Sequence, residues 1–156
     1  MSIYILALLI GIAAGLRAMT APAAVSIGAT PGWLPVSSTW TAFLAYRFTP
    51  YIFGALALVE FVTDQLPGTP SRKVPQQFGA RIVSGAFCGA AVGTAAGSAI
   101  GGLVAGVIGS VIGTLGGYEA RKRLVAATGG KDLPVALLED TVAVLLGLFV
   151  IAWVVP

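Results

Sequence analysis

The sequence predicts an all-α membrane protein, a polytopic helical bundle that forms a single integral membrane domain over residues 1–156. Of the 156 residues, 57% are apolar and only 10% are charged, against roughly 45–50% and about 25% in soluble domains. The mean hydropathy of +0.94 leaves too little polar surface to enclose a soluble core. Most of the stretches without charge are near or above the roughly 17–25 residues that a bilayer-spanning helix needs: 1–16, 18–46, 82–118 and 141–156, with the shorter 48–59 reaching that length only if Glu60 and Asp64 are included.

Three membrane segments are expected in the first half of the chain, which we take as about 2–66. Residues 2–19 predict an apolar helix. Residues 21–48 contain three prolines and two glycines, so a continuous helix is not expected there. This stretch either crosses the membrane as a broken helix or re-enters it and returns. Residues 49–66 predict a third helix, which ends before Pro67.

The second half, about 79–155, follows a polar loop over 67–81 and also predicts three segments. If the uncharged stretch 82–118 formed one helix, that helix would be far longer than the thickness of the hydrocarbon core of a bilayer, which is about 30 Å. We therefore expect a helix at about 79–97, a turn near 97–102, and a second helix at about 99–125. A last helix is expected at 134–155.

Glycine recurs at every fourth position through this predicted hairpin, with one interruption at Ala105. In water such glycines would weaken a helix by roughly 0.5–1 kcal/mol each relative to alanine. In a bilayer, small residues at this spacing let two helix backbones approach closely. We expect a helix-packing seam, within the chain or between subunits of a homo-oligomer, formed by Gly85, Gly89, Gly93, Gly97, Gly101, Gly109, Gly113 and Gly117.

The two halves are expected to be inverted repeats. The stretches ALVEFVTD (57–64) and ALLEDTVA (136–143) align with coincident alanine, leucine and glutamate, and such repeats are typical of transporters. Basic residues flank the loops near Arg72 and Arg121, and the bias of such residues toward the cytoplasm places both loops on that side. A crossing by 21–48 is preferred because it brings Arg17 to the same side as the acidic residues.

Charged side chains at membrane depth are the candidate functional site. Glu60 and Asp64 are four residues apart and share one helix face, where they would repel each other unless cations neutralise them. Arg17 and Arg81 are the available cations. The sequence leaves open a transport site or gate and a purely structural ion-pair cluster, formed by Arg17, Glu60, Asp64, Arg81, Glu139 and Asp140.

Glu139 and Asp140 point about 100° apart on a helix, so only one can face the carboxylates of the third segment. The repeat alignment favours Glu139, and Asp140 is then left to cap or solvate the start of the last segment.

Several classes of function are not expected. The sequence contains no histidine and one cysteine, Cys88, so it offers no zinc or haem ligand set and no histidine base. No metal and no other cofactor is therefore expected. A net charge of +3 is not typical of a nucleic-acid-binding protein, so no nucleic-acid partner is expected either. We do not expect an enzyme, because the polar residues of the loop offer only carboxylates as a base.

The stretches GLRAMTAPAAVS (15–26), LVEFVTDQLPGTPSR (58–72), ARIVSGAFCGAAVG (80–93) and ALLEDTVAV (136–144) resemble a family of small bacterial integral membrane proteins known only as a domain of unknown function. The resemblance covers nearly the whole chain. It implies an inner-membrane protein of four to six spans, and it implies no activity. Its most distinctive motif picks out Asp64, Pro67, Thr69, Pro70, Ser71 and Arg72.

Two functions are therefore weighed. The first is a transporter or channel for a small solute or ion, located in the inner membrane, with the charged cluster as its coupling or gating site. The second is a structural or lipid-organising protein that oligomerises through the glycine seam without transport. Membrane lipid is a partner in both cases.

Overall fold

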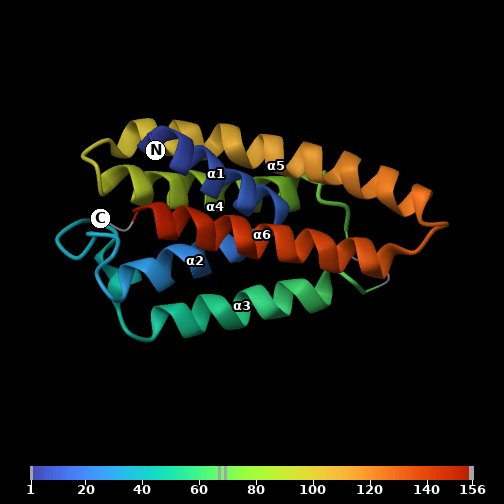
Figure 1. Cartoon of the computed structure of the whole chain (residues 1–156), viewed down its shortest axis with the longest axis horizontal. Helices are drawn as coiled ribbons and strands as arrows, with labels where there is room; N and C mark the ends of the chain where they lie inside the picture. Colours follow the sequence, from blue (N-terminus) through green and yellow to red (C-terminus); the bar gives the residue numbers. More distant parts are fainter. Residues whose placement is uncertain (1, 67, 69, 155–156) are drawn as a thin grey trace.

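A computed structural model describes residues 2–66, 68 and 70–154 of the chain. Within these residues the regular secondary structure is helical, as predicted, with no strand. Figure 1 shows the helices lying along the long axis of the molecule. The helices are α1 (Ile3–Leu16), α2 (Thr20–Ala29), α3 (Thr49–Thr63), α4 (Pro75–Thr94), α5 (Ala99–Ala127) and α6 (Asp132–Val154). Every helix except α2 begins and ends within four residues of its predicted bounds.

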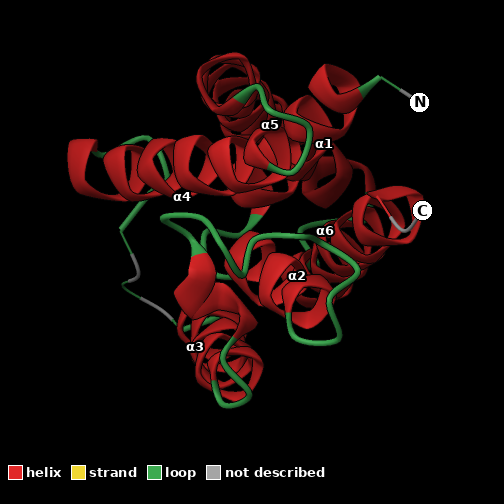
Figure 2. Cartoon of the chain, turned by 90° about the vertical axis from the view of Figure 1, so that its left-hand side faces the viewer, coloured by secondary structure: helices red, strands yellow, loops and turns green. Residues whose placement is uncertain are grey.

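The helices form two layers of three. One layer contains α1, α4 and α5, which pack on one another more closely than any other helices of the molecule. The other layer contains α2, α3 and α6, with α2 packed between its two neighbours. Figure 2 looks along the bundle and shows α1, α4 and α5 on one side and α2, α3 and α6 on the other. The α1–α6 contact joins the layers.

Glycines bring the backbones of the first layer together. A Cβ atom added to Gly89 of α4 would lie 2.8 Å from the Cα atom of Gly106 in α5, and one added to Gly93 would lie 2.8 Å from Cα of Gly102. On another face of α5, Gly109 and Gly113 lie against the backbone of α1. Because these approaches leave no room for a side chain, α5 uses glycine to contact two helices at once.

The sequence pattern assigned these glycines to a single row, and the structure divides them differently. The glycines of α5 that meet α4 are Gly102 and Gly106, which lie outside the predicted row. Gly97 lies in the turn between α4 and α5 with φ +71°, where glycine is favoured because it lacks a Cβ atom. The predicted hairpin therefore contains glycines in three different environments.

The stretch 21–48 forms one short helix and a folded loop. Pro22 is compatible with α2 because it falls in the first turn, whose N–H groups have no partner within the helix. Beyond Ala29 the chain continues without an α-helix to Thr49, with only a short 3-10 helix at Ala42–Ala45. Leu34, Val36 and Leu44 of this loop are fully buried, so the loop is part of the core. The helix itself covers only about 15 Å.

Successive helices reverse direction, and the two halves of the chain consequently run in opposite senses (Figure 1). The packing of the halves is not equivalent. α5 packs on α1 and α4, whereas α2, its counterpart in the first half, packs mainly on α3 and α6. The helices of the first half contain 14, 10 and 15 residues, against 20, 29 and 23 in the second. The two halves therefore run in opposite directions but differ in their packing and in the lengths of their helices.

Two of these helices, α5 and α6, are long and apolar enough to cross a membrane, by length and composition. Only 39% of the apolar window of each is buried inside the molecule. A core helix of a soluble protein would be mostly buried, whereas here the larger part of each window faces outward. α1, α2 and α3 are also apolar but have 10–17 residues.

Candidate functional site

The chain is broken between α1 and α2 at a point inside the protein. Arg17 has an extended backbone, with φ −143° and ψ 115°, and ends α1. Only two residues, Ala18 and Met19, separate it from the start of α2. Such a break leaves carbonyl groups at the end of one helix and N–H groups at the start of the next without helical partners.

Two charged side chains bind these backbone groups that lack helical partners. Glu60 accepts hydrogen bonds from the N–H groups of Ala18 and Met19, each at 2.8 Å. Arg81 donates to the carbonyl of Leu16 at 2.5 Å and to that of Gly15 at 3.1 Å. The signs match the partial charges at helix ends, since N-termini favour anions and C-termini favour cations.

Arg17 is the centre of the charged site. Its side chain has no exposed surface, and it forms ion pairs with Asp64 of the α3 C-cap and with Asp140 of α6, the latter at 2.5 Å between Nε and Oδ1. Arg81 extends the network, with its Nη2 atom 3.5 Å from Asp64 and 3.7 Å from Glu60. We call this set the central cluster: Arg17, Glu60, Asp64, Arg81 and Asp140.

The position of Asp140 corrects one prediction. The repeat alignment assigned Glu139 to face the acidic residues of α3, but Asp140 is the residue that shares Arg17 with Asp64. The helical period explains the result, because Asp140 lies on the buried face of α6 with Ala136, Ala143 and Gly147. Glu139 points about 100° away from that face.

Glu139 belongs to a second set of charges nearer the end of the bundle. Arg72 donates to both of its carboxylate oxygens, with 3.0 Å between Nη2 and Oε2. Arg121 of α5 approaches the same carboxylate at 3.4 Å and pairs with Asp132 at 2.7 Å. Lys73 lies 3.9 Å from the ring centroid of Tyr118. The two predicted basic loops therefore meet at one end of the molecule.

The loop motif is placed in part. Arg72 is buried and paired, as described. The hydroxyl of Ser71 accepts a hydrogen bond from the backbone N–H of Lys73 at 3.3 Å, and Pro70 lines a cavity described below. Pro67 and Thr69 lie outside the described residues. The loop is shorter than predicted, because Pro75 begins α4 at the position in a helix that proline favours.

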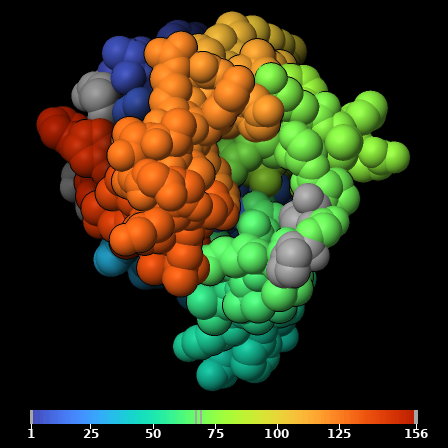
Figure 3. Space-filling model, turned by 90° about the vertical axis from the view of Figure 1, so that its right-hand side faces the viewer, coloured from blue at the N-terminus to red at the C-terminus, as the bar shows by residue number. Residues whose placement is uncertain are grey.

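Two cavities adjoin the central cluster. The end cavity, of about 340 Å³, is lined by Asp64, Arg72, Arg81 and Arg121 among others. Figure 3 looks onto this end of the molecule and shows a hollow between the α5–α6 end and the segment joining α3 to α4. This cavity is polar and is bounded by three cationic side chains and one anionic side chain.

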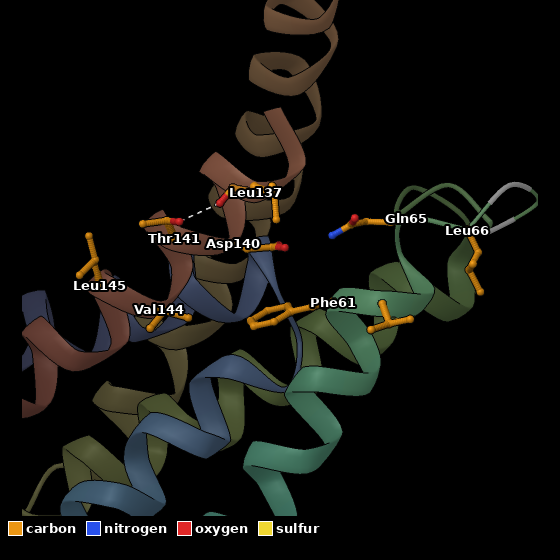
Figure 4. A pocket seen from close by; sticks show the side chains of 9 residues that line it. Phe61, Gln65, Leu66, Leu137, Asp140, Thr141, Val144 and Leu145 are labelled. Atoms are coloured by element: carbon orange, nitrogen blue, oxygen red, sulfur yellow. Dashed lines mark hydrogen bonds between the residues drawn. The ribbon is translucent and has the colours of Figure 1, made fainter. Parts of the chain in front are cut away.

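The lateral cavity, of about 600 Å³, lies between α3 and α6. Figure 4 shows Phe61 and Gln65 of the α3 side opposite Asp140 and Val144 of α6. Its lining is mainly apolar, and Asp140 is the charged residue in it. Leu66 lines both cavities. Since Arg17 binds Asp64 of one wall and Asp140 of the other, its ion pairs join the two cavities.

Some buried donors of the site have no protein partner. Among the residues that the structure describes, these are Nη2 of Arg17, Nε of Arg81 and the hydroxyl of Thr20. An unpaired buried donor costs free energy. No group of three or more potential metal ligands is found in the described part of the chain. The charged groups that the site presents are guanidinium and carboxylate groups.

A comparison of the sequence with models of known protein families finds one family that matches nearly the whole chain. The model of the family described as "Domain of unknown function (DUF4126)" matches residues 4–156. The chain belongs to this family. No curated protein and no solved structure matches it. The match confirms the resemblance that the four sequence motifs suggested, and every helix of the bundle lies within it or within one residue of it.

Within this DUF4126 chain, sequence reasoning overlooked several residues of the site. Asp132 and Tyr118 complete the charged end of the bundle through Arg121 and Lys73. Gly102 and Gly106 form the contact with α4. The sequence does contain a signal for these glycines, because Gly102 and Gly106 are themselves four residues apart. They are offset by one residue from the predicted row that contains Gly101 and Gly109.

Proposed function

We propose that the protein is a multi-pass inner-membrane transporter or channel for a small solute or ion, with the central cluster as its coupling or gating site. The observation that carries this proposal is the placement of Arg17, fully buried and ion-paired to both Asp64 and Asp140, where the walls of two cavities meet.

The outer surface supports a membrane location. α5 exposes Ile100, Ile108 and Ile112, and α6 exposes Leu145. Aromatic side chains, among them Trp33, Trp40 and Tyr51, are exposed in the 30–48 loop and at the start of α3. Membrane proteins place such aromatic side chains at the interface with water and basic residues on the cytoplasmic side. At the other end lie basic residues of the loops, Arg72 and Lys131, and of the last turns of α5, Arg121, Lys122 and Arg123.

The energetics of the cluster favour a functional role. Ionised groups in an apolar bundle are expensive, and in membrane proteins they are commonly retained where they line a substrate or ion pathway. A helix broken inside the protein is tolerated where its free backbone groups find partners or line a cavity. Here Glu60 and Arg81 supply the partners, and the cavities lie beside the break.

The alternative of a structural oligomer loses its main support. Gly89, Gly93 and Gly113 are in contact with backbone of their own chain. A second copy therefore cannot use these faces without separating helices of the first. Substituting them with leucine would disrupt the bundle itself, and loss of an oligomer would not then be a specific result.

Flux measurements in proteoliposomes test the proposal. Purified protein is reconstituted, and the movement of protons, potassium and chloride is followed in separate preparations with internal reporters. We expect at least one flux above that of protein-free vesicles, and we expect Arg17→Ala and Glu60→Gln to change it by about tenfold or more, the scale of an interaction worth 1.4 kcal/mol.

The matched control is Arg123→Gln, which removes an arginine of α5 whose side chain is 78% exposed and pairs only with Glu119 in the described structure. Its flux should equal that of the unmodified protein. If wild-type vesicles and all variants, each shown to be folded by thermal unfolding, are indistinguishable from protein-free vesicles, the transport proposal is wrong.

A further inference from the structure

The end cavity carries the chemistry of an anion site. Arg72, Arg81 and Arg121 surround a space of about 340 Å³, and Asp64 is the single acidic residue of its wall. Arg72 and Arg121 already bind the carboxylates of Glu139 and Asp132 through part of their N–H groups. A guanidinium carries five N–H groups, so each of them keeps donors that match the oxygens of a phosphate group. Ser71 and Tyr118 also line the space and carry hydroxyl groups.

One of these arginines retains an unused donor. Arg81 is 1% exposed and directs its Nη1 atom to α1 carbonyls and its Nη2 atom toward Asp64 and Glu60. Its Nε atom has no hydrogen-bond partner within the described chain. A buried donor of this kind is normally satisfied by protein, water or ligand, and Arg81 lines the end cavity.

The neighbouring lateral cavity indicates what else the ligand contains. It has about 600 Å³, is lined by Phe61, Val62, Val144 and Leu145, and lies on the outer surface between α3 and α6. Val62 and Leu145 are more than half exposed. A free anion would gain nothing from this apolar space, whereas an acyl chain would fill it and pack against its apolar side chains.

We propose that the two cavities together bind an anionic phospholipid, with its phosphate among Arg72, Arg81 and Arg121 and one acyl chain along the groove between α3 and α6. Leu66, which lines both cavities, marks the point where the headgroup region meets the chain region. Basic pockets between membrane helices are suited to such headgroups. The inference rests on the proposed membrane location and does not require transport.

Lipid binding to the full chain in neutral detergent tests this inference. Native mass spectrometry follows the titration of dioleoyl-phosphatidylglycerol, with dioleoyl-phosphatidylcholine as the uncharged-headgroup reference. We expect the anionic lipid to bind about tenfold more tightly, and Arg121→Gln to remove most of that preference. Arg123→Gln, two residues away on α5 but outside the cavity wall, should retain the full preference.

A second variant separates a lipid from free phosphate. Val62→Trp fills the lateral cavity without altering any charge, and it should weaken phosphatidylglycerol binding about fivefold if an acyl chain occupies that space. Unchanged lipid binding in Val62→Trp, together with displacement by inorganic phosphate, would show a free-anion site and overturn the proposal. Equal binding of the two lipids by the wild-type protein would also overturn it.

The measurement does not depend on flux. A protein that selects the anionic lipid but moves no ion supports this inference and contradicts only the transport function. If Arg121→Gln fails to fold, Val62→Trp decides the question alone, because it leaves every ion pair in place.

Discussion

At the scale of single residues, Arg17 and Asp140 depend on each other for their place in an apolar bundle. Arg17 is fully buried and Asp140 nearly so, and burying either charge alone would carry a large desolvation cost. The attraction between them offsets that cost only while both partners are present. Removing one carboxylate therefore leaves a guanidinium that is incompletely neutralised.

We expect Asp140→Asn to lower the stability of the protein by about 3–5 kcal/mol, the range seen when one partner of a buried ion pair is removed. The measurement is thermal or denaturant unfolding in detergent. Glu119→Gln is the control, since Glu119 pairs with Arg123 at the surface and its loss should not move the transition. Equal transitions for Asp140→Asn and the wild-type protein would show that Asp64 alone neutralises Arg17.

A second prediction concerns the helix break. Glu60→Ala removes both acceptors of the Ala18 and Met19 N–H groups and should cost about 1–3 kcal/mol, because a buried donor is left unsatisfied. Glu60→Gln keeps one acceptor and should lose less. Unfolding measurements on both variants check this order. A loss as large in Glu60→Gln as in Glu60→Ala would mean that the charge, and not the hydrogen bonds, holds the break.

At the scale of elements, the close contact of α4 with α5 depends on missing side chains. Gly89→Ala would bring a methyl group within 2.8 Å of the Gly106 Cα atom, so the helices must separate, at a cost of about 1–3 kcal/mol. Gly116→Ala is the matched control, because Gly116 lies in α5 with nothing within 4 Å of its added Cβ. Alanine there should be neutral or stabilising by about 0.5–1 kcal/mol. Parallel unfolding curves test the pair.

The extents of most helices could be predicted from the sequence because uncharged runs, prolines and turn glycines mark them directly. The stretch 21–48 could not be resolved, since its prolines exclude a long helix without indicating how the loop folds back. Burial of Leu34 and Val36 depends on the other helices. For the site, the shared position of Arg17, Glu60, Asp64 and Arg81 was predicted from the requirement that charges pair.

The choice between Glu139 and Asp140 was missed because it was made by aligning two short stretches. The buried face of α6, read from its own helical period, would have selected Asp140. The helix that contacts each glycine could likewise not be predicted from the sequence. A four-residue period indicates that one helix face lacks large side chains, but it does not indicate which helix packs on that face.

At the scale of the whole molecule, the basic end and the aromatic end should lie on opposite sides of a membrane. Ser37→Cys in the aromatic loop and Thr128→Cys beyond α5 both introduce exposed thiols. We expect an impermeant thiol reagent to label Ser37→Cys from outside and Thr128→Cys from the cytoplasmic side. The native Cys88 is fully buried and should remain unlabelled in both. Labelling of the two positions from the same side would contradict this arrangement.

The break at Arg17 also constrains the order in which the protein can mature during synthesis. Arg17 leaves the ribosome well before its partners, which lie in α3 and α6, and the carbonyls beside it bind a side chain of α4. Until α6 is translated, the arginine lacks one of its two counter-charges. The region around the break therefore stays incomplete until α6 has been added, and nascent chains that stop before α6 present an incompletely neutralised cation to quality-control proteases.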